Sequence, residues 1–571
     1  MKKYRHVNSA LILLLIMLGA RTAHSQTVPL GLLENVEDQY RRLQLLGKDT
    51  TGNSFTVRPL TLPTFDHDTD GNSFYTYKEL LKPLFNNAKL NMQISALPVM
   101  LQQQYNFKAP FGMNDNSMVQ SRGYQAAISA GFFFRWGPLS VQLYPEYVYA
   151  QNKSFLGPES NVNESGFQKA YASYIYNKID NPSSFGESAY NKFSWGQSSV
   201  RLTFNPISLG LSNENLWWGP GIKNSLLMSN TASGFKHLTL NTTKPVDIYL
   251  GKIEGQMIAG KLESSGIDLP STVRPEYRKY YTNKPDDWRY FSGFIFTYQP
   301  KWIPNLFLGI DRSFVIYRKD MGKSIGDYLP IFTALEKQGG VNRETNVYQE
   351  DLKKRDQYLS VFARWVMPES KAELYTEFGR NDHAYNIRDL LSEPEHSRAY
   401  ILGFRKLFAL RSQDEYIQFG FEMTQLELSK TSNLRPTESW YSHYQVTDGY
   451  TNRGQILGAG IGPGSNIQST EVSWVKGMKR IGFTLDRLVH NNDFLYNTNS
   501  SVTEVRRHWI DFAFGANFGW DFNRFIINSN LTYIRTLNNQ WLIDNDGSFY
   551  WDIPKVDTNN LHFKVGLAYK W

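Results

Sequence analysis

Cysteine is absent from all 571 residues of the chain. The chain therefore forms no disulfide bond, and it cannot be tethered as a lipoprotein through an acylated N-terminal cysteine. Long apolar runs are also missing. Beyond the first 25 residues no unbroken apolar stretch reaches the roughly 18 residues that a membrane-spanning helix requires. The fold must consequently rest on burial and backbone pairing.

The first 25 residues are typical of a secretory signal peptide. Three basic residues among the first five precede an apolar run from Ala10 to Ala20, and the small residues of Ala23 to Ser25 suit signal peptidase. The mature chain is therefore expected to begin at Gln26. The segment holds four basic residues and no acid, so the formal charge of +8 falls to +4 after cleavage. This small surplus argues against nucleic acid as a partner.

Alternation with a period of two residues dominates the chain after about residue 88, which is the side-chain geometry of a β-strand. In the C-terminal stretch LHFKVGLAYKW, apolar and aromatic residues occupy nearly every second position from Leu561 to Trp571. Lys564 and Lys570 lie on the opposite face. A slip of one residue would turn both lysines outward, at a cost of roughly 2 to 4 kcal/mol each near a bilayer midplane, so the register is firmly set.

Two architectures bury strands of this kind, a soluble sandwich or a closed barrel in an outer membrane. The polar face carries many charged and amide side chains, the apolar face ends repeatedly in Trp or Tyr, and the last residue is Trp571. These features favour an all-β, antiparallel transmembrane β-barrel of about 16–18 strands in the cell outer membrane, over residues 88–571. A C-terminal aromatic residue resembles the signal read by the barrel-assembly machinery. That machinery and outer-membrane lipid are expected partners.

Helical spacing is found in the N-terminal element, residues 26–87. The stretch LLENVEDQYRRLQLLG places Leu33, Val36, Tyr40 and Leu43 on one face and ends at Gly47. A second short helix is expected in YTYKELL. We expect this element to cap the periplasmic mouth of the barrel or to dock inside it.

The tests for metal and catalytic motifs favour structural interpretations. DHDTDGN places Asp66, Asp68 and Asp70 as in a calcium loop, but Tyr77 stands where the bidentate Glu is required. A solvated acidic turn is the favoured interpretation and a weak calcium site the alternative, and no cofactor is expected. No HExxH pair occurs. We predict that the protein is not an enzyme, with a hydrolase assembled from separate strands as the alternative.

The same period of two residues places polar side chains in rows along one face of a strand. Glu373, Tyr375 and Glu377 share one strand face, and Lys252, Glu254 and Gln256 share another, so both rows are expected to line the lumen. Paired acids could indicate glycoside hydrolysis, but acids spaced along one strand more often form ion pairs with Arg across a barrel interior. The glycine-rich LGAGIGPGS lacks the strand-to-helix context of a phosphate loop, so a loop folded into the barrel is expected.

Adjacent tryptophans in NENLWWGPG raise a question of orientation. Trp217 and Trp218 cannot face the same side of an extended segment, so one is expected in the lipid interface and the other toward the lumen or turn. Ile207, Leu209 and Leu211 are expected to face outward. If every second residue continues to do so, Trp217 also faces outward, unless SNEN breaks the register. We predict a tight turn over Gly219, Pro220 and Gly221 and an architectural role for the Trp pair.

Four stretches, PVMLQQQYNFKAPFGMNDNSM, GPLSVQLYPEYVYAQN, ENLWWGPGIKNSLLMSN and TNRGQILGAGIGPGSN, together resemble the Wzi-type capsule assembly proteins, especially the form found in the Bacteroidetes. The most specific part is WWGP followed by SLLMSN, which ends in Ser229 and Asn230. The resemblance implies an outer-membrane barrel with a small N-terminal helical element. It further implies a surface lectin that binds exported capsular polysaccharide and helps to hold it to the cell.

Two polar loops combine aromatic rings with amides and acids, as a sugar-binding surface requires. The candidate residues are Trp440, Tyr441, Tyr444 and Tyr450 in one loop and Trp541, Tyr550 and Trp551 in the other. For any single ring, a place in the interfacial girdle is the alternative. The predicted function is therefore a polysaccharide-binding barrel that supports capsule assembly, with a porin or substrate channel as the alternative.

Overall fold

The computed structural model describes residues 26–31, 34–49, 52–61, 80–330, 340–341, 348–349, 354–381, 387–412, 414–498, 507–522, 524–542 and 556–571. The expected signal peptide, the expected second helix up to residue 79, the turn with Asp66, Asp68 and Asp70, and the candidates Tyr550 and Trp551 lie outside the described residues. Within the described ranges, no helix combines the length and apolar character needed to cross a membrane.

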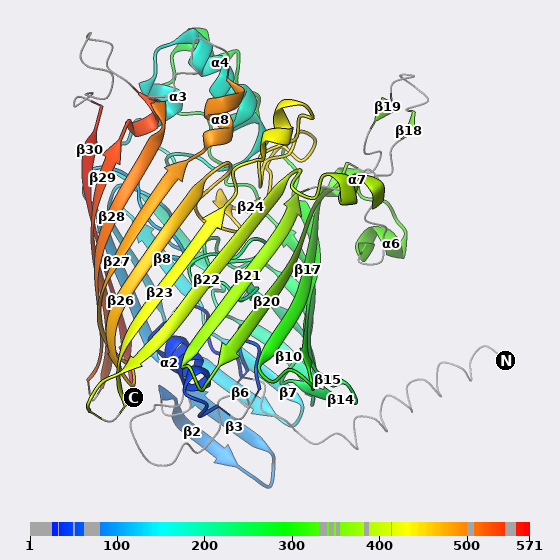
Figure 1. Cartoon of the computed structure of the whole chain (residues 1–571), viewed down its shortest axis with the longest axis vertical. Helices are drawn as coiled ribbons and strands as arrows, with labels where there is room; N and C mark the ends of the chain where they lie inside the picture. Colours follow the sequence, from blue (N-terminus) through cyan, green and yellow to red (C-terminus); the bar gives the residue numbers. More distant parts are fainter. Residues whose placement is uncertain are drawn as a thin grey trace, which may run out of the picture.

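An antiparallel sheet of 24 strand segments forms the wall of the molecule (Figure 1). In chain order the segments are β2 (Lys82–Asn87), β3 (Met92–Ala96), β4 (Val99–Asn106), β5 (Gly123–Ser129), β6 (Phe132–Trp136), β7 (Leu139–Leu143), β8 (Glu146–Ala150), β9 (Tyr190–Ser194), β10 (Ser199–Phe204), β11 (Ile207–Ser212), β13 (His237–Thr242), β14 (Val246–Ile248), β15 (Gly251–Leu262), β16 (Arg289–Pro300), β17 (Leu306–Tyr317), β20 (Asp356–Met367), β21 (Ala372–Asn381), β22 (Arg398–Ala409), β23 (Glu415–Gln425), β26 (Asn466–Lys476), β27 (Lys479–His490), β28 (Trp509–Phe522), β29 (Phe525–Leu537) and β30 (Thr558–Tyr569).

Five of the strands that run from one end of the wall to the other are each divided into two segments. The sheet therefore has more segments than full strands. The interrupted pairs are β3/β4, β5/β6, β7/β8, β9/β10 and β13/β14, and β2 lies beyond the end of the wall. When each divided pair is counted as one strand and β2 is left out, the 24 segments of the described sheet form 18 full strands. This number is at the upper end of the predicted range. β30 pairs with β4 from His562 opposite Asn106 to Tyr569 opposite Val99, so the last strand meets the first.

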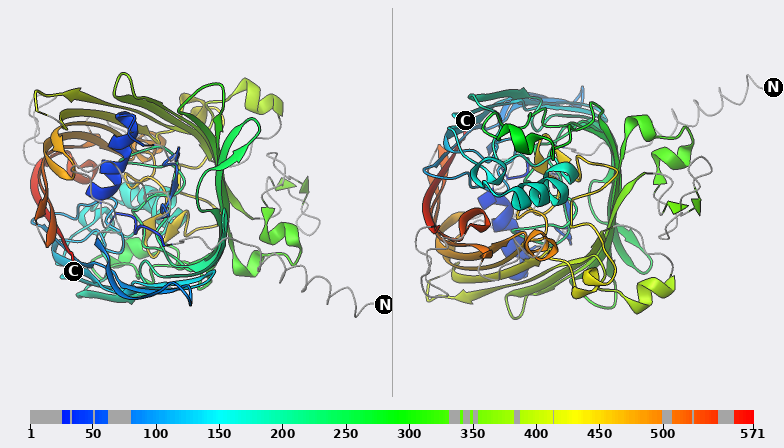
Figure 2. Two further views of the ribbon diagram at one scale, coloured as in Figure 1. Left: turned by 90° about the horizontal axis from the view of Figure 1, so that it is seen from below. Right: turned by 90° about the horizontal axis from the view of Figure 1, so that it is seen from above.

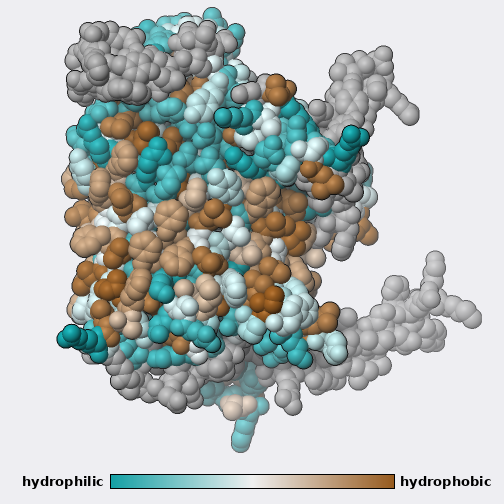
Figure 3. Space-filling model, viewed as in Figure 1, coloured by the Kyte–Doolittle hydropathy of each residue, from teal (hydrophilic) through white to brown (hydrophobic). Residues whose placement is uncertain are grey.

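The two faces of the wall follow the predicted alternation. Ile207, Leu209 and Leu211 are 51%, 53% and 57% exposed on the outside. On the face drawn in Figure 3, apolar side chains form a band across the middle of the molecule. Lys564 and Lys570 point inward and form ion pairs with Asp115 and Asp521. The period of two therefore sets both the register and the polarity of the strands.

Short turns and long loops lie at opposite ends of the barrel. The end with the short turns, here called the turn end, also holds the C-terminus (Figure 1). The opposite loop end is covered by α3 (Pro158–Asn161), α4 (Ser165–Tyr174) and α8 (Asn492–Asn497), while α6 (Ile325–Tyr328) and α7 (Ile387–Ser392) project to the side. Further short elements in the loops are η3 (Tyr176–Lys178), α5 (Pro275–Arg278), η4 (Arg318–Asp320), β18 (Gly340–Val341), β19 (Tyr348–Gln349), η6 (Lys430–Asn433) and η8 (Asn539–Trp541).

Three segments of the chain fill the lumen (Figure 2). The first carries α2 (Glu34–Leu45) and β1 (Val57–Arg58), so the predicted helix docks inside the barrel near its turn end. The second spans residues 213–236 and contains β12 (Trp217–Trp218), which pairs with β1. The third spans residues 439–465, includes β24 (Thr451–Asn452) and β25 (Gln455–Ile456), and contains the glycine-rich loop.

The Trp pair departs from the expected orientation. Trp217 and Trp218 are 4% and 0% exposed, so the expectation that one ring faces the lipid interface is wrong. The reason is that the chain leaves the wall after Ser212. Glu214 then forms a buried ion pair with Arg201, 2.6 Å away, and this pair holds the SNEN segment inside the lumen. Gly219, with φ of +95°, makes the turn that follows.

Candidate functional site

Ion pairs between the wall and α2 lock the turn end of the lumen. The buried carboxylate of Glu373 lies 2.9 Å from Arg41 of α2 and 2.7 Å from Arg364. Arg405 adds a second bridge to α2 through Asp38, at 2.7 Å. Burial alone would raise the pKa of Asp38, but the guanidinium groups around it, Arg405 among them, lower the pKa below its ordinary value. We call this group the latch.

A second carboxylate of the wall holds the turn that follows the Trp pair. Glu422 accepts hydrogen bonds from the backbone N–H groups of Ile222, Lys223 and Asn224, at 2.7, 3.1 and 2.8 Å. The hydroxyl of Tyr375 also donates to Glu422, at 2.9 Å. Three successive N–H groups that converge on one anion form a nest, so the geometry of this turn is fixed by a charge within the protein itself.

The remaining residues of the predicted polar rows have separate partners. Glu377 accepts from the N–H of Leu226 at 3.1 Å, and Glu254 accepts from the N–H of Ser54 at 2.7 Å. The indole of Trp218 donates to Gln256 at 2.8 Å. The side chain of Lys252 is partly exposed, and its ammonium nitrogen lies 3.7 Å from the carboxylate of Asp247.

The WWGP and SLLMSN segments are bound to the other lumen segments. The guanidinium of Arg58 lies 4.5 Å above the ring of Trp217. The hydroxyl of Ser229 donates to the carbonyl oxygen of Gly458, and the side chain of Asn230 accepts from Asn215 at 2.7 Å. The structure therefore gives the residues of this motif packing partners inside the barrel.

Most of the first predicted sugar-binding cluster lies inside the barrel. Trp440, Tyr441 and Tyr450 are each 0% exposed. Their polar atoms donate to Ser397, Leu226 and Ser313 within the protein, and Tyr450 packs 4.4 Å from Tyr358. Of this cluster only Tyr444 presents its ring to solvent, at 51% exposure.

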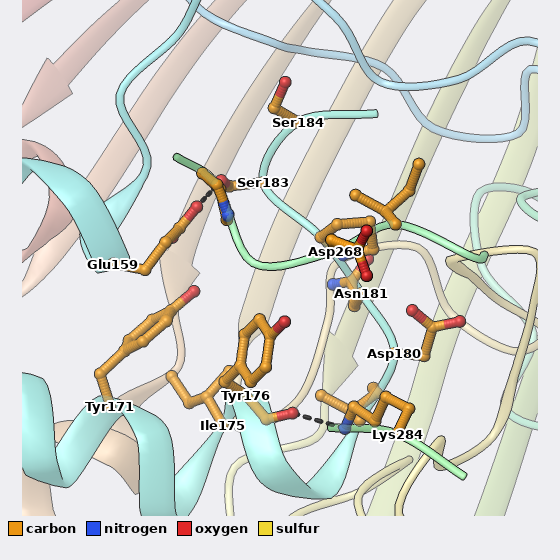
Figure 4. A pocket seen from close by; sticks show the side chains of 14 residues that line it. Glu159, Tyr171, Ile175, Tyr176, Asp180, Asn181, Ser183, Ser184, Asp268 and Lys284 are labelled. Atoms are coloured by element: carbon orange, nitrogen blue, oxygen red, sulfur yellow. Dashed lines mark hydrogen bonds between the residues drawn. The ribbon is translucent and has the colours of Figure 1, made fainter. Parts of the chain in front are cut away.

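A cleft opens between the loops at the loop end (Figure 4). Its volume is about 30 Å³, and its polar lining includes Glu159, Tyr176, Asp180, Asp268 and Lys284. The hydroxyl of Ser183 donates to Glu159, and Lys284 donates to the carbonyl oxygens of Tyr176 and Thr447. We call this site the outer cleft.

Burial shifts the titration of three groups in the outer cleft. It raises the pKa of Glu159 and lowers the pKa of Lys284 to about 8. Burial, together with the charge of Glu159, raises the pKa of Tyr176 to about 12. At neutral pH Tyr176 is therefore a neutral hydroxyl group, able both to donate and to accept a hydrogen bond.

The sequence reasoning missed the residues of the outer cleft and the rings around it. Tyr174 and Tyr496 expose 43% and 55% of their surface at the loop end, and Tyr277 stacks on Tyr280 at 6.5 Å. The signal was present in PEYRKYYTNK, where three tyrosines lie among polar residues, as rings do in the two predicted clusters. Trp541, from the second cluster, lies buried beneath the loops.

No group of three or more His, Cys, Asp or Glu side chains that could hold a metal ion occurs in the described part of the chain. A His–carboxylate pair does occur, because His490 lies 2.8 Å from Asp511.

A strand wall with an apolar outer band, a lumen filled by its own chain and a polar loop end define an outer-membrane β-barrel. In such barrels the short turns face the periplasm, so the loop end is extracellular. The chain belongs to the family described as capsule assembly protein Wzi, which it matches over residues 100–529. The family membership predicted from the sequence is thereby confirmed.

Solved structures provide the remaining comparisons. The chain is similar to Wzi of Escherichia coli, described as an outer membrane protein involved in group 1 capsule assembly and a carbohydrate-binding β-barrel, with a TM-score of 0.56, 13% identity and coverage of 95% of this chain and 99% of that chain. It also matches OccAB2 of Acinetobacter baumannii (TM-score 0.37, 8% identity, 83% and 97% coverage) and OccK7 of Pseudomonas aeruginosa (0.36, 11%, 83% and 98%). No curated protein sequence matches the chain.

Proposed function

We propose that the protein is an outer-membrane lectin that binds exported capsular or other surface polysaccharide at its extracellular end and supports attachment of the capsule. The observation that carries the proposal is the outer cleft, a polar site flanked by exposed aromatic rings at the extracellular end. Membership of the capsule assembly family supports it. So does the likeness to an Escherichia coli barrel that is described as carbohydrate-binding.

The chemistry of the outer cleft suits a polymer of sugars. Sugar rings present apolar C–H faces that pack on aromatic rings, and their hydroxyl groups pair with carboxylates and amides. Tyr174 and Tyr444 supply exposed rings, while Asp268 and Asn181 supply exposed polar groups at the cleft. A volume of about 30 Å³ is far below the roughly 300–1,000 Å³ of clefts that enclose a ligand, so the polymer lies across the cleft and places single hydroxyl groups in it.

A binding assay with the purified barrel and the surface polysaccharide of its own host tests the proposal. We expect the double variant Tyr174→Ala/Tyr444→Ala to bind the polymer several-fold more weakly, because each lost stacking surface contributes about 1 kcal/mol. The matched control is Trp302→Ala, since Trp302 is 63% exposed in a short turn at the periplasmic end. Equal binding by the double variant and the control would contradict this placement of the site.

The cellular test concerns retention of the polymer. A strain that lacks the protein should still make the polysaccharide but release more of it into the medium. Unchanged cell-bound glycan would refute the proposed role. The same proposal holds that the protein binds the polymer without cleaving it, so incubation with purified barrel should leave the polymer length unchanged.

A channel is the second candidate function, because charged rows line the wall of the lumen. The filled lumen supports the lectin instead, since α2 and the WWGP segment occupy the space that a solute would cross. Planar-bilayer recordings of the refolded barrel should therefore show no stable conductance. Steady open channels in the wild-type protein would favour the channel.

We further infer that insertion uses the barrel-assembly machinery and that lipid surrounds the apolar band. Trp571 supports this inference, since its ring is 51% exposed at the end of β30. Trp571→Ala should lower the amount of folded barrel in the membrane, measured by its heat-modifiable migration.

A further inference from the structure

Three positively charged side chains gather at the extracellular edge of the wall. Lys108 follows β4, Arg122 precedes β5 and Lys153 follows β8. The backbone N–H of Lys153 donates to the carbonyl oxygen of Arg122 at 2.9 Å, so these two residues lie opposite each other on neighbouring segments. The guanidinium of Arg122 donates to the carbonyl oxygen of Phe107 at 3.3 Å, which places it beside Lys108. We call Lys108, Arg122 and Lys153 the cation cluster.

The order of side chains along β5 shows which way the cation cluster faces. Ile128 and Tyr124 are 46% and 37% exposed on the outside of the wall, whereas Ala127 between them is buried. Arg122 continues this outward row two residues beyond Tyr124. The row therefore passes from apolar through aromatic to cationic, as expected where a barrel leaves the lipid and enters the headgroup region.

The neighbouring strand β30 gives the height of the cation cluster relative to the membrane. The N–H of Phe107 donates to the carbonyl oxygen of Leu561 at 3.1 Å, so the two residues are level. The stretch from Leu561 to Trp571, whose outward side chains are all apolar or aromatic, extends about 26 Å along the barrel axis, at roughly 3.4 Å per residue and a tilt of about 40°. The apolar band of outer-membrane barrels is about 25 Å tall. Phe107 therefore marks the extracellular edge of the band, and Lys108 is the first residue beyond it.

No carboxylate neutralises the cation cluster. None of its three members forms an ion pair with another residue that the structure describes. Another cation at the same end of the wall does have such a partner, because Arg535 lies 2.8 Å from Asp557. Three like charges held side by side repel one another, and a bound anion would relieve that repulsion.

Two members of the cation cluster are held in place by their surroundings. Arg122 also donates to the carbonyl oxygen of Ser154, at 3.1 Å. The ammonium group of Lys153 donates to the hydroxyl of Tyr105 at 3.3 Å and lies 5.6 Å from the centre of that ring. Tyr105 in turn packs on Phe107, with ring centres 4.6 Å apart. The cations are thus placed directly beside an outward apolar surface, and little side-chain entropy remains to be lost on binding.

We propose that the cation cluster binds the phosphate groups of a glycolipid in the outer leaflet, with the acyl chains of that lipid along Phe107 and the apolar band. The fork of Arg122 pairs with phosphate oxygens, and the two lysines act as point charges. A lipid is favoured over a soluble anionic polymer because the cluster lies at the edge of the lipid-facing side of the wall, away from the outer cleft. The inference goes beyond the lectin function and does not depend on it.

Native mass spectrometry of the full-length barrel in detergent tests the lipid site. The probes are diphosphorylated lipid A and the same lipid after removal of its phosphate groups. We expect only the phosphorylated form to bind tightly. The triple variant Lys108→Gln/Arg122→Gln/Lys153→Gln should bind it roughly tenfold more weakly or less still, because each cation near a charged headgroup contributes about a fivefold factor.

A matched control removes the same charge from the other end of the barrel. Lys89, Lys244 and Lys301 are exposed in turns at the periplasmic end. The variant Lys89→Gln/Lys244→Gln/Lys301→Gln should bind phosphorylated lipid A like the wild type. Should the loss of Arg122 disturb folding, Lys108→Gln/Lys153→Gln keeps the two hydrogen bonds of the guanidinium and should still weaken binding several-fold.

The outcomes separate this site from the lectin function. Equal binding of lipid A by the cluster variants and the control, or equal binding of the two lipid forms, refutes the lipid site. Full displacement of the lipid by inorganic phosphate would also overturn it, since a plain anion site would suffice. If the cluster variants keep the lipid but lose the polysaccharide of the host, the cluster belongs to the polymer instead. Failure of the barrel to bind that polysaccharide would refute the lectin function and leave the lipid site standing.

Discussion

Replacing Glu373 by alanine should release the latch that holds α2 in the barrel. Glu373 is 0% exposed and lies 2.9 Å from Arg41, 2.7 Å from Arg364 and 3.8 Å from Arg405. Removing one partner of a buried ion pair costs about 3–5 kcal/mol, because the remaining charges stay buried without compensation. We expect the lower part of this range, since the bridge from Arg405 to Asp38 persists. This loss of stability should mainly affect the docking of α2 in the barrel, because Arg41 belongs to that helix.

Limited proteolysis at the periplasmic end measures the effect. Glu373→Ala should make the N-terminal segment more sensitive to protease and should allow transient conductance in planar bilayers, while the β-barrel itself stays heat-modifiable. Glu415→Ala is the matched control, because Glu415 pairs with Lys476 at 2.8 Å where β23 begins and β26 ends, and an ion pair exposed to solvent contributes little to stability. Equal protease resistance in the two variants would refute the assignment of the latch.

Three further outcomes are expected. Glu422→Ala leaves three N–H groups and the hydroxyl of Tyr375 without their acceptor, so it should destabilise the folded barrel by roughly 3 kcal/mol or more, measured by heat-modifiable migration. Trp218→Phe removes the bond to Gln256 and should cost about 1 kcal/mol while polymer binding stays unchanged; weaker binding by a folded variant would contradict the architectural role. Burial raises the pKa of Asp493 from 3.8 to about 7. Its contribution to stability is therefore complete below pH 3.8 and lost as the pH rises to about 7, and Asp493→Asn should flatten this part of the melting profile.

The sequence sufficed for the barrel wall because the two faces of its strands meet different surroundings. Leu209 and Leu211 face outward and Lys564 faces inward, as alternation predicts, and no knowledge of strand partners was needed to place them. The helix that ends before Gly47 was equally legible, since its spacing is local. Such local patterns set the class of fold.

The contents of the lumen could not be read in the same way. Arg41 and Glu373 are 332 positions apart, and nothing in either local pattern indicates the other. Trp440 and Tyr450 lie in a polar loop with the composition of a binding surface, yet they are buried because the loop turns back into the barrel. Composition identifies aromatic loops, whereas their burial depends on long-range partners.

The filling of the lumen explains how a barrel can serve as a rigid platform for a polymer. In the glycine-rich loop, the carbonyl oxygen of Leu457 accepts from the N–H of Ser229 at 2.7 Å. Ser229 belongs to the segment of the WWGP turn, which Glu422 fixes to the wall. A series of packed and hydrogen-bonded contacts therefore runs from the glycine-rich loop to the strands. Because interactions of this kind favour a single arrangement, the loop end can hold its aromatic rings in place before the glycan arrives, which lowers the entropy lost on binding.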